Sequence, residues 1–152
     1  FGIPGESNQQ LVEAANLLNE LSVDGVKLHN LHVLQNTLLA QEYDSGNFSP
    51  IDLKEYAERV VLFLENLDQN ISIHRLTAVA PRWEELIAPQ WTKEKMRPVQ
   101  YIENLLATHE TWQGRMLNFV FRSLNPLFFD KLFNIPYPIP RFLMWFRWFR
   151  QN

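Results

Sequence analysis

The sequence contains no cysteine among its 152 residues. A chain without thiols has no disulfide framework, no thiolate zinc site, no iron–sulfur ligand and no cysteine nucleophile. No spacing typical of a Ser-His-Asp triad, a P-loop or a zinc site is present either. No stretch reaches the roughly 18 uncharged apolar residues that a bilayer span needs. The first residues also lack a basic segment followed by an apolar run, so we see no secretory signal and expect a cytoplasmic protein.

What the chain does contain is typical of a globular domain, with 46% hydrophobic and 20% charged residues. Its charge is unevenly distributed. Residues 1–114 hold 8 Lys+Arg against 16 Asp+Glu, a balance of −8, whereas residues 115–152 hold 6 against 1, a balance of +5. Of the 20 aromatic residues, 11 also lie in residues 115–152. The composition therefore changes near Gly114, and we expect a boundary there.

Hydrophobic spacing predicts an α/β fold. Apolar residues at helical intervals indicate a helix over 8–21, and a strand begins near Gly25 after the turn signal Asp24-Gly25. A second helix is predicted from an N-cap at Ser49, with Pro50 in its first turn, to about Leu67. The segment NISIHRL predicts another short strand. Helices alternating with strands at this spacing favour βαβ units and a parallel sheet.

The two strands each have an apolar and a polar face. We expect Val26, Leu28, Ile71 and Ile73 to face the covering helices, which leaves Lys27, His29, Ser72 and His74 on the other side. Polar residues near the carboxyl ends of barrel strands commonly form a catalytic mouth. The alternative is that they are satisfied polar groups on an exposed strand face. Continued as a strand, His29 and His32 would lie on opposite faces, so we expect no metal site there.

The segment FGIPGES places two glycines before a helix, at the very start of the chain. A strand that runs into such a turn and then a helix is a βα turn, and in α/β folds ligands bind beside these turns. Glycines allow a ligand to approach the backbone, and the helix N-terminus offers unpaired N–H groups. A plain turn remains the alternative to a ligand-contacting one.

Several ordered blocks resemble a known family. The segments GIPGES, DGVKLHNLHVLQNTLLAQEYDSG, ISIHRLTAVAP, LIAPQW and WQG, within residues 1–114, are similar to the carboxyl-terminal half of bacterial radical S-adenosylmethionine (SAM) proteins, an uncharacterised group similar to the elongator catalytic subunit. The resemblance implies a partial (β/α) barrel with SAM and a [4Fe-4S] cluster at its carboxyl mouth. It assigns to the SAM pocket Gly2, Ile3, Gly5 and Glu6. It assigns to the substrate side Lys27, His29, His32, His74, Arg75 and Thr77.

The sequence departs from this family at its central chemical requirement. Radical SAM chemistry needs a cluster held by three cysteines, usually in a CxxxCxxC loop after the first strand, and this chain has none. We therefore expect a truncated chain whose partner is the missing amino-terminal half of the barrel, and which cannot bind the cluster and is inactive alone. No catalytic residue and no metal ligand is assigned. By analogy with the elongator relative, the substrate of the complete protein would be tRNA.

The resemblance divides the chain into the barrel part at 1–77, a family extension at 78–114 and a basic aromatic tail at 115–152. In the extension we expect a helix over 97–109, and packing rather than base stacking for Trp83, Trp91 and Trp112. For the tail, which contains Pro136, Pro138 and Pro140, there are three alternatives: a membrane-interfacial helix, packing against the missing barrel half or a partner protein, or a frameshifted sequence. The rival to an enzyme portion is thus a non-catalytic interaction module that reaches a membrane or a partner protein through the tail.

Overall fold

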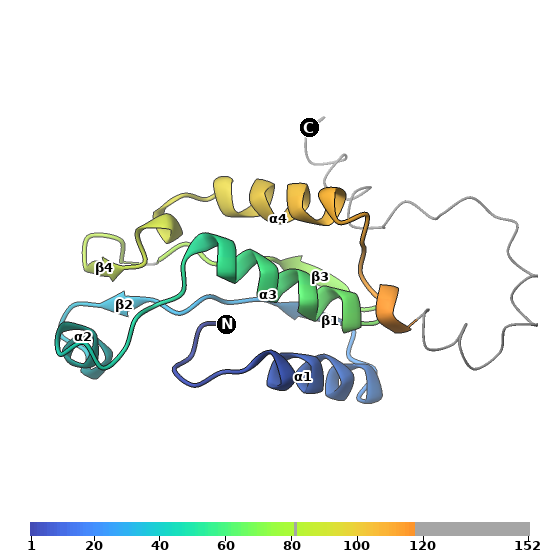
Figure 1. Cartoon of the computed structure of the whole chain (residues 1–152), viewed down its shortest axis with the longest axis horizontal. Helices are drawn as coiled ribbons and strands as arrows, with labels where there is room; N and C mark the ends of the chain where they lie inside the picture. The colour runs from blue at the N-terminus through green and yellow to red at the C-terminus, as the bar shows by residue number, and fades with distance from the viewer. Residues whose placement is uncertain (81, 118–152) are drawn as a thin grey trace, which may run out of the picture.

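The computed structural model describes residues 1–80 and 82–117. Along the chain the elements are α1 (Asn8–Glu20), β1 (Gly25–Lys27), β2 (Val33–Leu34), α2 (Leu38–Asp44), α3 (Leu53–Asn66), β3 (Ser72–Arg75), β4 (Leu86–Ala88), the 3₁₀ helix η1 (Gln90–Lys93) and α4 (Arg97–Thr108). Helix α3 packs between α1 and α4, and β1 and β3 lie side by side behind it (Figure 1).

Helix boundaries follow from their capping groups. Helix α1 starts at a capping box in which the Ser7 side chain and the Gln10 side chain each bond the other's backbone N–H, and the predicted helix over 8–21 is confirmed. The predicted N-cap of the second helix is wrong. Asp52, not Ser49, caps α3, because its Oδ1 accepts the Glu55 N–H at 2.8 Å and the next residue, Leu53, is the first buried apolar position. The helix predicted over 97–109 is confirmed as α4.

Two small sheets hold the strands. β1 and β3 pair in parallel with Gly25 opposite Ser72 and Val26 opposite Ile73, which confirms the predicted parallel pairing. β2 and β4 form a separate antiparallel pair that the sequence pattern did not predict. The described fold is therefore mixed α/β with few, short strands, and a barrel remains a proposal.

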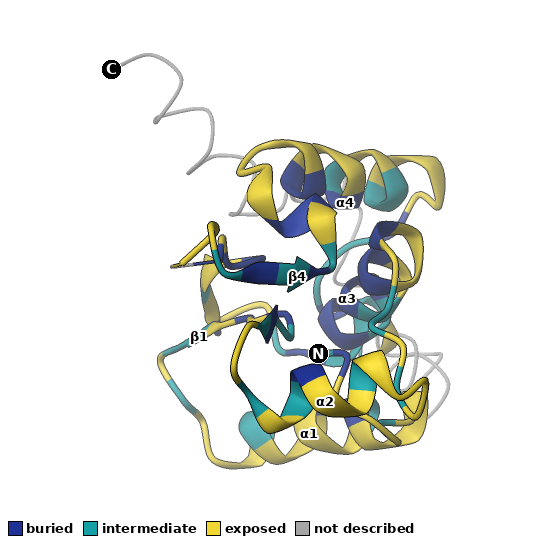
Figure 2. Cartoon of the chain, turned by 90° about the vertical axis from the view of Figure 1, so that its left-hand side faces the viewer, coloured by how far each residue is buried: buried dark blue, intermediate teal, exposed yellow. Residues whose placement is uncertain are grey.

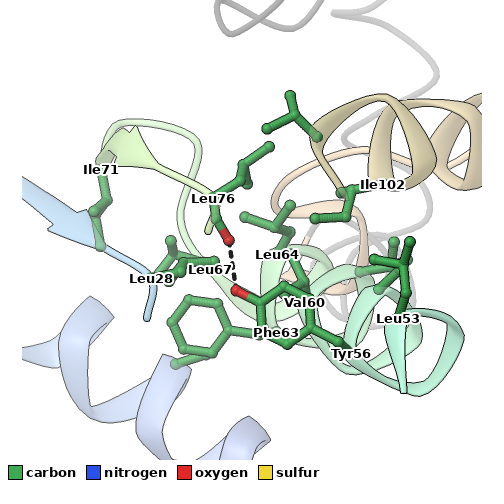
Figure 3. Packing of buried hydrophobic residues seen from close by; sticks show 14 of the residues in the cluster. Leu28, Leu53, Tyr56, Val60, Phe63, Leu64, Leu67, Ile71, Leu76 and Ile102 are labelled. Atoms are coloured by element: carbon green, nitrogen blue, oxygen red, sulfur yellow. Dashed lines mark hydrogen bonds between the residues drawn. The ribbon is translucent and has the colours of Figure 1, made fainter. Parts of the chain in front are cut away.

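The hydrophobic core lies between the β1–β3 sheet and the helices (Figure 3). Its completely buried members are Ala15, Tyr56, Ala57, Val60, Leu67 and Ile102. Leu28 and Ile71 are buried in this cluster and Val26 and Ile73 pack against it, so the predicted apolar strand face is confirmed. Each fully buried Val, Leu or Ile side chain contributes about 1.5–3 kcal/mol to the free energy of folding before entropy is counted. The core thus fixes which strand face is turned to solvent.

The predicted packing of the tryptophans is only partly correct. Trp91 is buried against the core and donates its indole N–H to the Ile51 carbonyl at 3.2 Å. Trp83 is 58% exposed, because it lies in the turn before β4 rather than on an element that faces the core. The Arg115 guanidinium lies 5.5 Å from the ring centroid of the half-buried Trp112. The predictions for the tail beyond residue 117 lie outside the described residues.

Candidate functional site

The polar face of β1 and β3 is open to solvent. Lys27 and His29 from the β1 segment and His74 and Arg75 from β3 are all exposed. Figure 2 shows β1 at the edge of the molecule that faces away from α3. A Cβ at Gly25 would collide with the His74 imidazole, so the ring of His74 lies across β1 at the position where a glycine leaves room. The structure therefore brings these predicted residues to one surface.

A buried asparagine joins the ends of the two strands. Asn30 is 2% exposed, and its Oδ1 accepts the Ala78 N–H at 2.7 Å and the Thr77 hydroxyl at 2.9 Å. Its Nδ2 lies 2.8 Å from Nε2 of His32. Because both polar atoms of the amide are used, the side chain behaves as a clamp between the segments that follow β1 and β3. Asn30 was missed by the sequence prediction.

Tyr56 supports the same region from α3. Its hydroxyl donates to the Leu76 carbonyl at 2.7 Å, one residue after β3 ends (Figure 3). Burial raises the pKa of this phenol well above its ordinary value, because the phenolate would lose its hydration. Tyr56 is therefore a neutral donor at physiological pH. It anchors the chain between Arg75 and Thr77.

His29 and His32 lie together rather than on opposite strand faces. The alternation of exposed and buried residues holds through Asn30 but does not extend to His32, and the ring centroids of His29 and His32 are 5.5 Å apart in an edge-to-face arrangement. Burial lowers the pKa of His32, and the charges of His29 and Arg75 lower it further, while the hydrogen bond to the Ala78 carbonyl opposes them. Two imidazoles without a carboxylate do not make a metal site. The described residues contain no group of three His, Cys, Asp or Glu that could hold a metal ion.

The glycine turn lies next to the end of β1. The amino group of Phe1 donates to the His29 carbonyl at 2.7 Å, and the Leu31 N–H donates to the Phe1 carbonyl at 3.0 Å. This is the hydrogen-bond pattern of a parallel strand pair centred on Phe1 and Asn30. It places the turn that begins at Gly2 beside the carboxyl end of β1, as a βα turn requires.

Within the turn, the residues divide into supporting and exposed ones. The Oε2 atom of Glu6 accepts the Gly2 N–H at 2.7 Å and pairs with Arg59 of α3 at 3.2 Å, so this oxygen is used inside the protein. Gly2 is buried with φ +87°, and a Cβ there would lie 3.1 Å from the Ile51 side chain. In contrast, Ile3 is 60% exposed, and nothing lies within 4 Å of the place where a Gly5 Cβ would be. Of the four residues assigned to the SAM pocket, Ile3 and Gly5 are thus the ones that a ligand can reach.

Two surface depressions lie away from these residues. One shallow depression is bordered by α2 and Ile87, and another lies along the outer side of α3 beside Glu55, Glu58 and Arg59. Neither includes a predicted site residue. The candidate site on β1 and β3 is an open face, because Lys27, His29, His74 and Arg75 are exposed.

Comparison with known proteins agrees with the resemblance found in the sequence. Residues 23–108 match the model of the Radical_SAM C-terminal domain. The chain is 29% identical over 114 residues to the uncharacterized protein YtqA of Bacillus subtilis and to the uncharacterized protein MJ0486 of Methanocaldococcus jannaschii, covering 75% of this chain and 35% of each relative. It is 27% identical over 108 residues to the protein YhcC of Escherichia coli, covering 71% of this chain and 35% of the relative. The chain thus spans about a third of the length of the curated relatives it matches.

In residues 1–80 and 82–117 no helix is long and apolar enough to cross a membrane.

Proposed function

The chain belongs to the Radical_SAM C-terminal domain family, and from this membership we propose that it is the carboxyl-terminal portion of a radical SAM enzyme. In this proposal β1, β3 and the segment at Phe1 are parallel strands of a partial (β/α) barrel. One observation supports this proposal. The glycine turn, the residues after β1 and the residues after β3, which were all predicted from the sequence, lie together at the carboxyl ends of these strands. Ligands of α/β folds bind at this end.

The turn would contribute the SAM side of the pocket. Gly5 leaves its backbone open, and the exposed Ile3 offers an apolar surface for an aromatic base. Gly2 and Glu6 act indirectly, because the Glu6 carboxylate closes the turn through the Gly2 N–H and the Arg59 guanidinium. SAM bound to a reduced cluster supplies a 5′-deoxyadenosyl radical, and the cluster needs thiolates that this chain does not contain. The cluster would be held by residues outside this chain.

The face formed by Lys27, His29, His74 and Arg75 would contribute the substrate side. These side chains carry no catalytic assignment. His32 and Thr77 belong to the Asn30 clamp, so their proposed role is to hold the neighbouring residues in place.

A chimeric protein tests this function. Residues 1–114 would replace the matching third of YtqA, and the chimera would be purified without oxygen and given SAM and dithionite. We expect 5′-deoxyadenosine from the chimera and from YtqA, measured by chromatography against a no-protein control. Gly5→Ala should weaken SAM binding in the chimera, because a Cβ would occupy the open approach to the backbone.

The matched control is Gly46→Ala. Gly46 has φ +75° and also has nothing within 4 Å of an added Cβ, so both variants carry a similar backbone strain of about 1 kcal/mol. Only Gly5 belongs to the turn. A folded chimera that forms no 5′-deoxyadenosine while YtqA does, or equal SAM affinity in both glycine variants, would contradict the proposed role.

A further inference from the structure

The open face of β1 and β3 is free of carboxylates in an otherwise acidic region. Residues 1–114 have a balance of −8, yet residues 25–41 and 69–83 contain no Asp or Glu. These two stretches contain β1 and β3 together with the segments that follow them. The charged and titratable side chains on this face, Lys27, His29, His74 and Arg75, are therefore all basic.

The cations of this face are also not used in ion pairs. Of the four arginines in residues 1–114, Arg59, Arg82 and Arg97 each pair with a carboxylate at 2.7–3.3 Å. Arg75 does not, and neither it nor Lys27 has a carboxylate within ion-pair distance among the described residues. A domain with a twofold excess of acids has ample carboxylates for pairing. The lack of a partner at this face is therefore a local property, and it leaves the cations available to a ligand.

Strand pairing places the two cations of this face, Lys27 and Arg75, close together. Lys27 is the register partner of Arg75 across the parallel pair. The His29 Nδ1 lies 2.8 Å from the Asn30 carbonyl, and because a carbonyl only accepts, Nδ1 carries the proton and Nε2 is left for another partner. The Asn30 clamp and the Tyr56 bond to Leu76 hold the backbone on both sides of Arg75. Such support preorganises a site and reduces the ordering cost of binding.

The neighbouring His32 is affected by the same face. Burial is the main cause of its lowered pKa, and the charges of His29 and Arg75 lower that pKa further.

We propose that Lys27 and Arg75, with His29 and His74 further along the same face, form a binding site for a phosphate group of the substrate. This inference rests on the proposed function of this face. Arginine binds phosphate through two parallel N–H groups, and lysine adds a point charge. Donors that come from two paired strands suit an ion with three free oxygens better than a carboxylate, which has two. The phosphate belongs to either a mononucleotide or an RNA strand, and the two sources are separated by the probes below.

The test is direct binding to the full 152-residue chain, which needs no cluster or SAM. The probes are adenosine monophosphate, adenosine as its uncharged counterpart, and a short single-stranded RNA, with affinity from NMR titration of labelled protein. The site variant is Lys27→Gln with Arg75→Gln. The control is Lys95→Gln with Arg97→Gln, which removes the same charge at exposed positions before and within the first turn of α4 and leaves the basic tail intact.

We expect the phosphate probe to shift the amide signals of Lys27–His29 and Ser72–Arg75 while adenosine does not. Loss of two charge-assisted contacts should weaken binding about tenfold or more in the site variant, and less than about twofold in the control. Tighter binding of RNA than of the mononucleotide would assign the phosphate to a nucleic acid, and the reverse to a small metabolite. Equal losses in both variants, or no preference for the phosphate over adenosine, would overturn the inference.

The two proposals fail separately. A chimera that forms no 5′-deoxyadenosine, combined with a tenfold loss in the site variant, would contradict only the radical SAM function. A chimera that cleaves SAM, combined with unchanged binding in the site variant, would contradict only the phosphate site.

Discussion

Asn30, rather than any of the predicted residues, connects the two halves of the candidate site. The alternation Lys27, Leu28, His29, Asn30 places it in the phase of the buried Leu28, where an apolar residue is expected. A polar side chain at a buried position needs partners, and this was the signal in the sequence that could have identified it. Its partners Thr77 and Ala78 are almost 50 residues away in the chain, and local spacing carries no information about them.

The pH dependence of stability follows from His32. Its folded pKa is lowered from the ordinary 6.5, chiefly by burial, so the fold favours the neutral ring. The protonated ring would also present an N–H to the Asn30 amide group, which is itself a donor. A lowered folded pKa contributes stability that is fully present above the unfolded pKa and is lost as pH falls through the folded value. We expect the free energy of unfolding, measured by urea denaturation, to decrease as pH falls from 7 through 6.5 toward 5.

Two variants identify the group responsible for this decrease. His32→Gln keeps a hydrogen-bonding side chain without a titration, so its unfolding free energy should vary less with pH in this window. His109→Gln removes an exposed histidine at the end of α4 and should follow the unsubstituted chain. A His32→Gln protein with the full pH dependence would show that other groups, such as carboxylates, cause it.

At the scale of elements, long periodic segments were predictable and short ones were not. The periodic apolar faces of α1, α3 and α4 bury their side chains in one core, so their existence and approximate ends were correctly predicted. Helix α2 has seven residues and one buried side chain, Ala40, and was not predicted. Its one local signal is Thr37, whose hydroxyl accepts the Ala40 N–H at 3.2 Å. β2 and β4 have two and three residues and pair across half of the described chain, so no period-two pattern could reveal them.

The segment after α4 should stabilise the α3–β3 connection. Gln113 donates its amide to the carbonyls of Asp68 at 2.6 Å and Ile71 at 2.8 Å, and the Gly114 N–H donates to the Leu64 carbonyl at 2.9 Å. Gly114 has φ +79°, and an added Cβ would lie 2.9 Å from the Gln69 side chain and 3.3 Å from the Leu67 carbonyl. Gly114→Ala should therefore cost about 2–4 kcal/mol of unfolding free energy, from backbone strain and the close contact together.

Gly46→Ala again provides the comparison, because it has a similar φ of +75° and no neighbour within 4 Å. It should cost about 1 kcal/mol, the backbone part alone. The difference between the two variants in urea denaturation measures the contact at residue 114. Equal losses of unfolding free energy in the two variants would mean that the contact at residue 114 relaxes. The segment after α4 would then contribute little to the stability of the α3–β3 connection.

For the molecule as a whole, the resemblance predicted more than the periodicity did. The segments after β1 and β3 lie within residues 23–108, which match the family model, and the glycine turn meets them at the same end of the strands. Barrel closure is a long-range property, and the described sheets have two strands each, so the barrel remains a proposal. The division at residues 77 and 114 also remains a prediction. Val99 and Ile102 of α4 share one core with β1 and α3.

The last prediction is that this chain alone forms no iron–sulfur cluster and does not cleave SAM. Cluster assembly needs thiolate ligands, and the sequence contains no cysteine at any position. Histidine replaces only part of a cysteine set in known clusters, and the described residues offer no group of three candidate ligands. After anaerobic incubation with iron, sulfide and dithionite, the purified chain should lack the broad visible absorption of a cluster, and added SAM should give no 5′-deoxyadenosine above a no-protein control. The positive control is YtqA treated in the same way, for which the proposed family chemistry predicts both signals. If the cysteine-free chain produced 5′-deoxyadenosine, an electron would have reached SAM without protein thiolates. The proposal that residues outside this chain must hold the cluster would then be wrong.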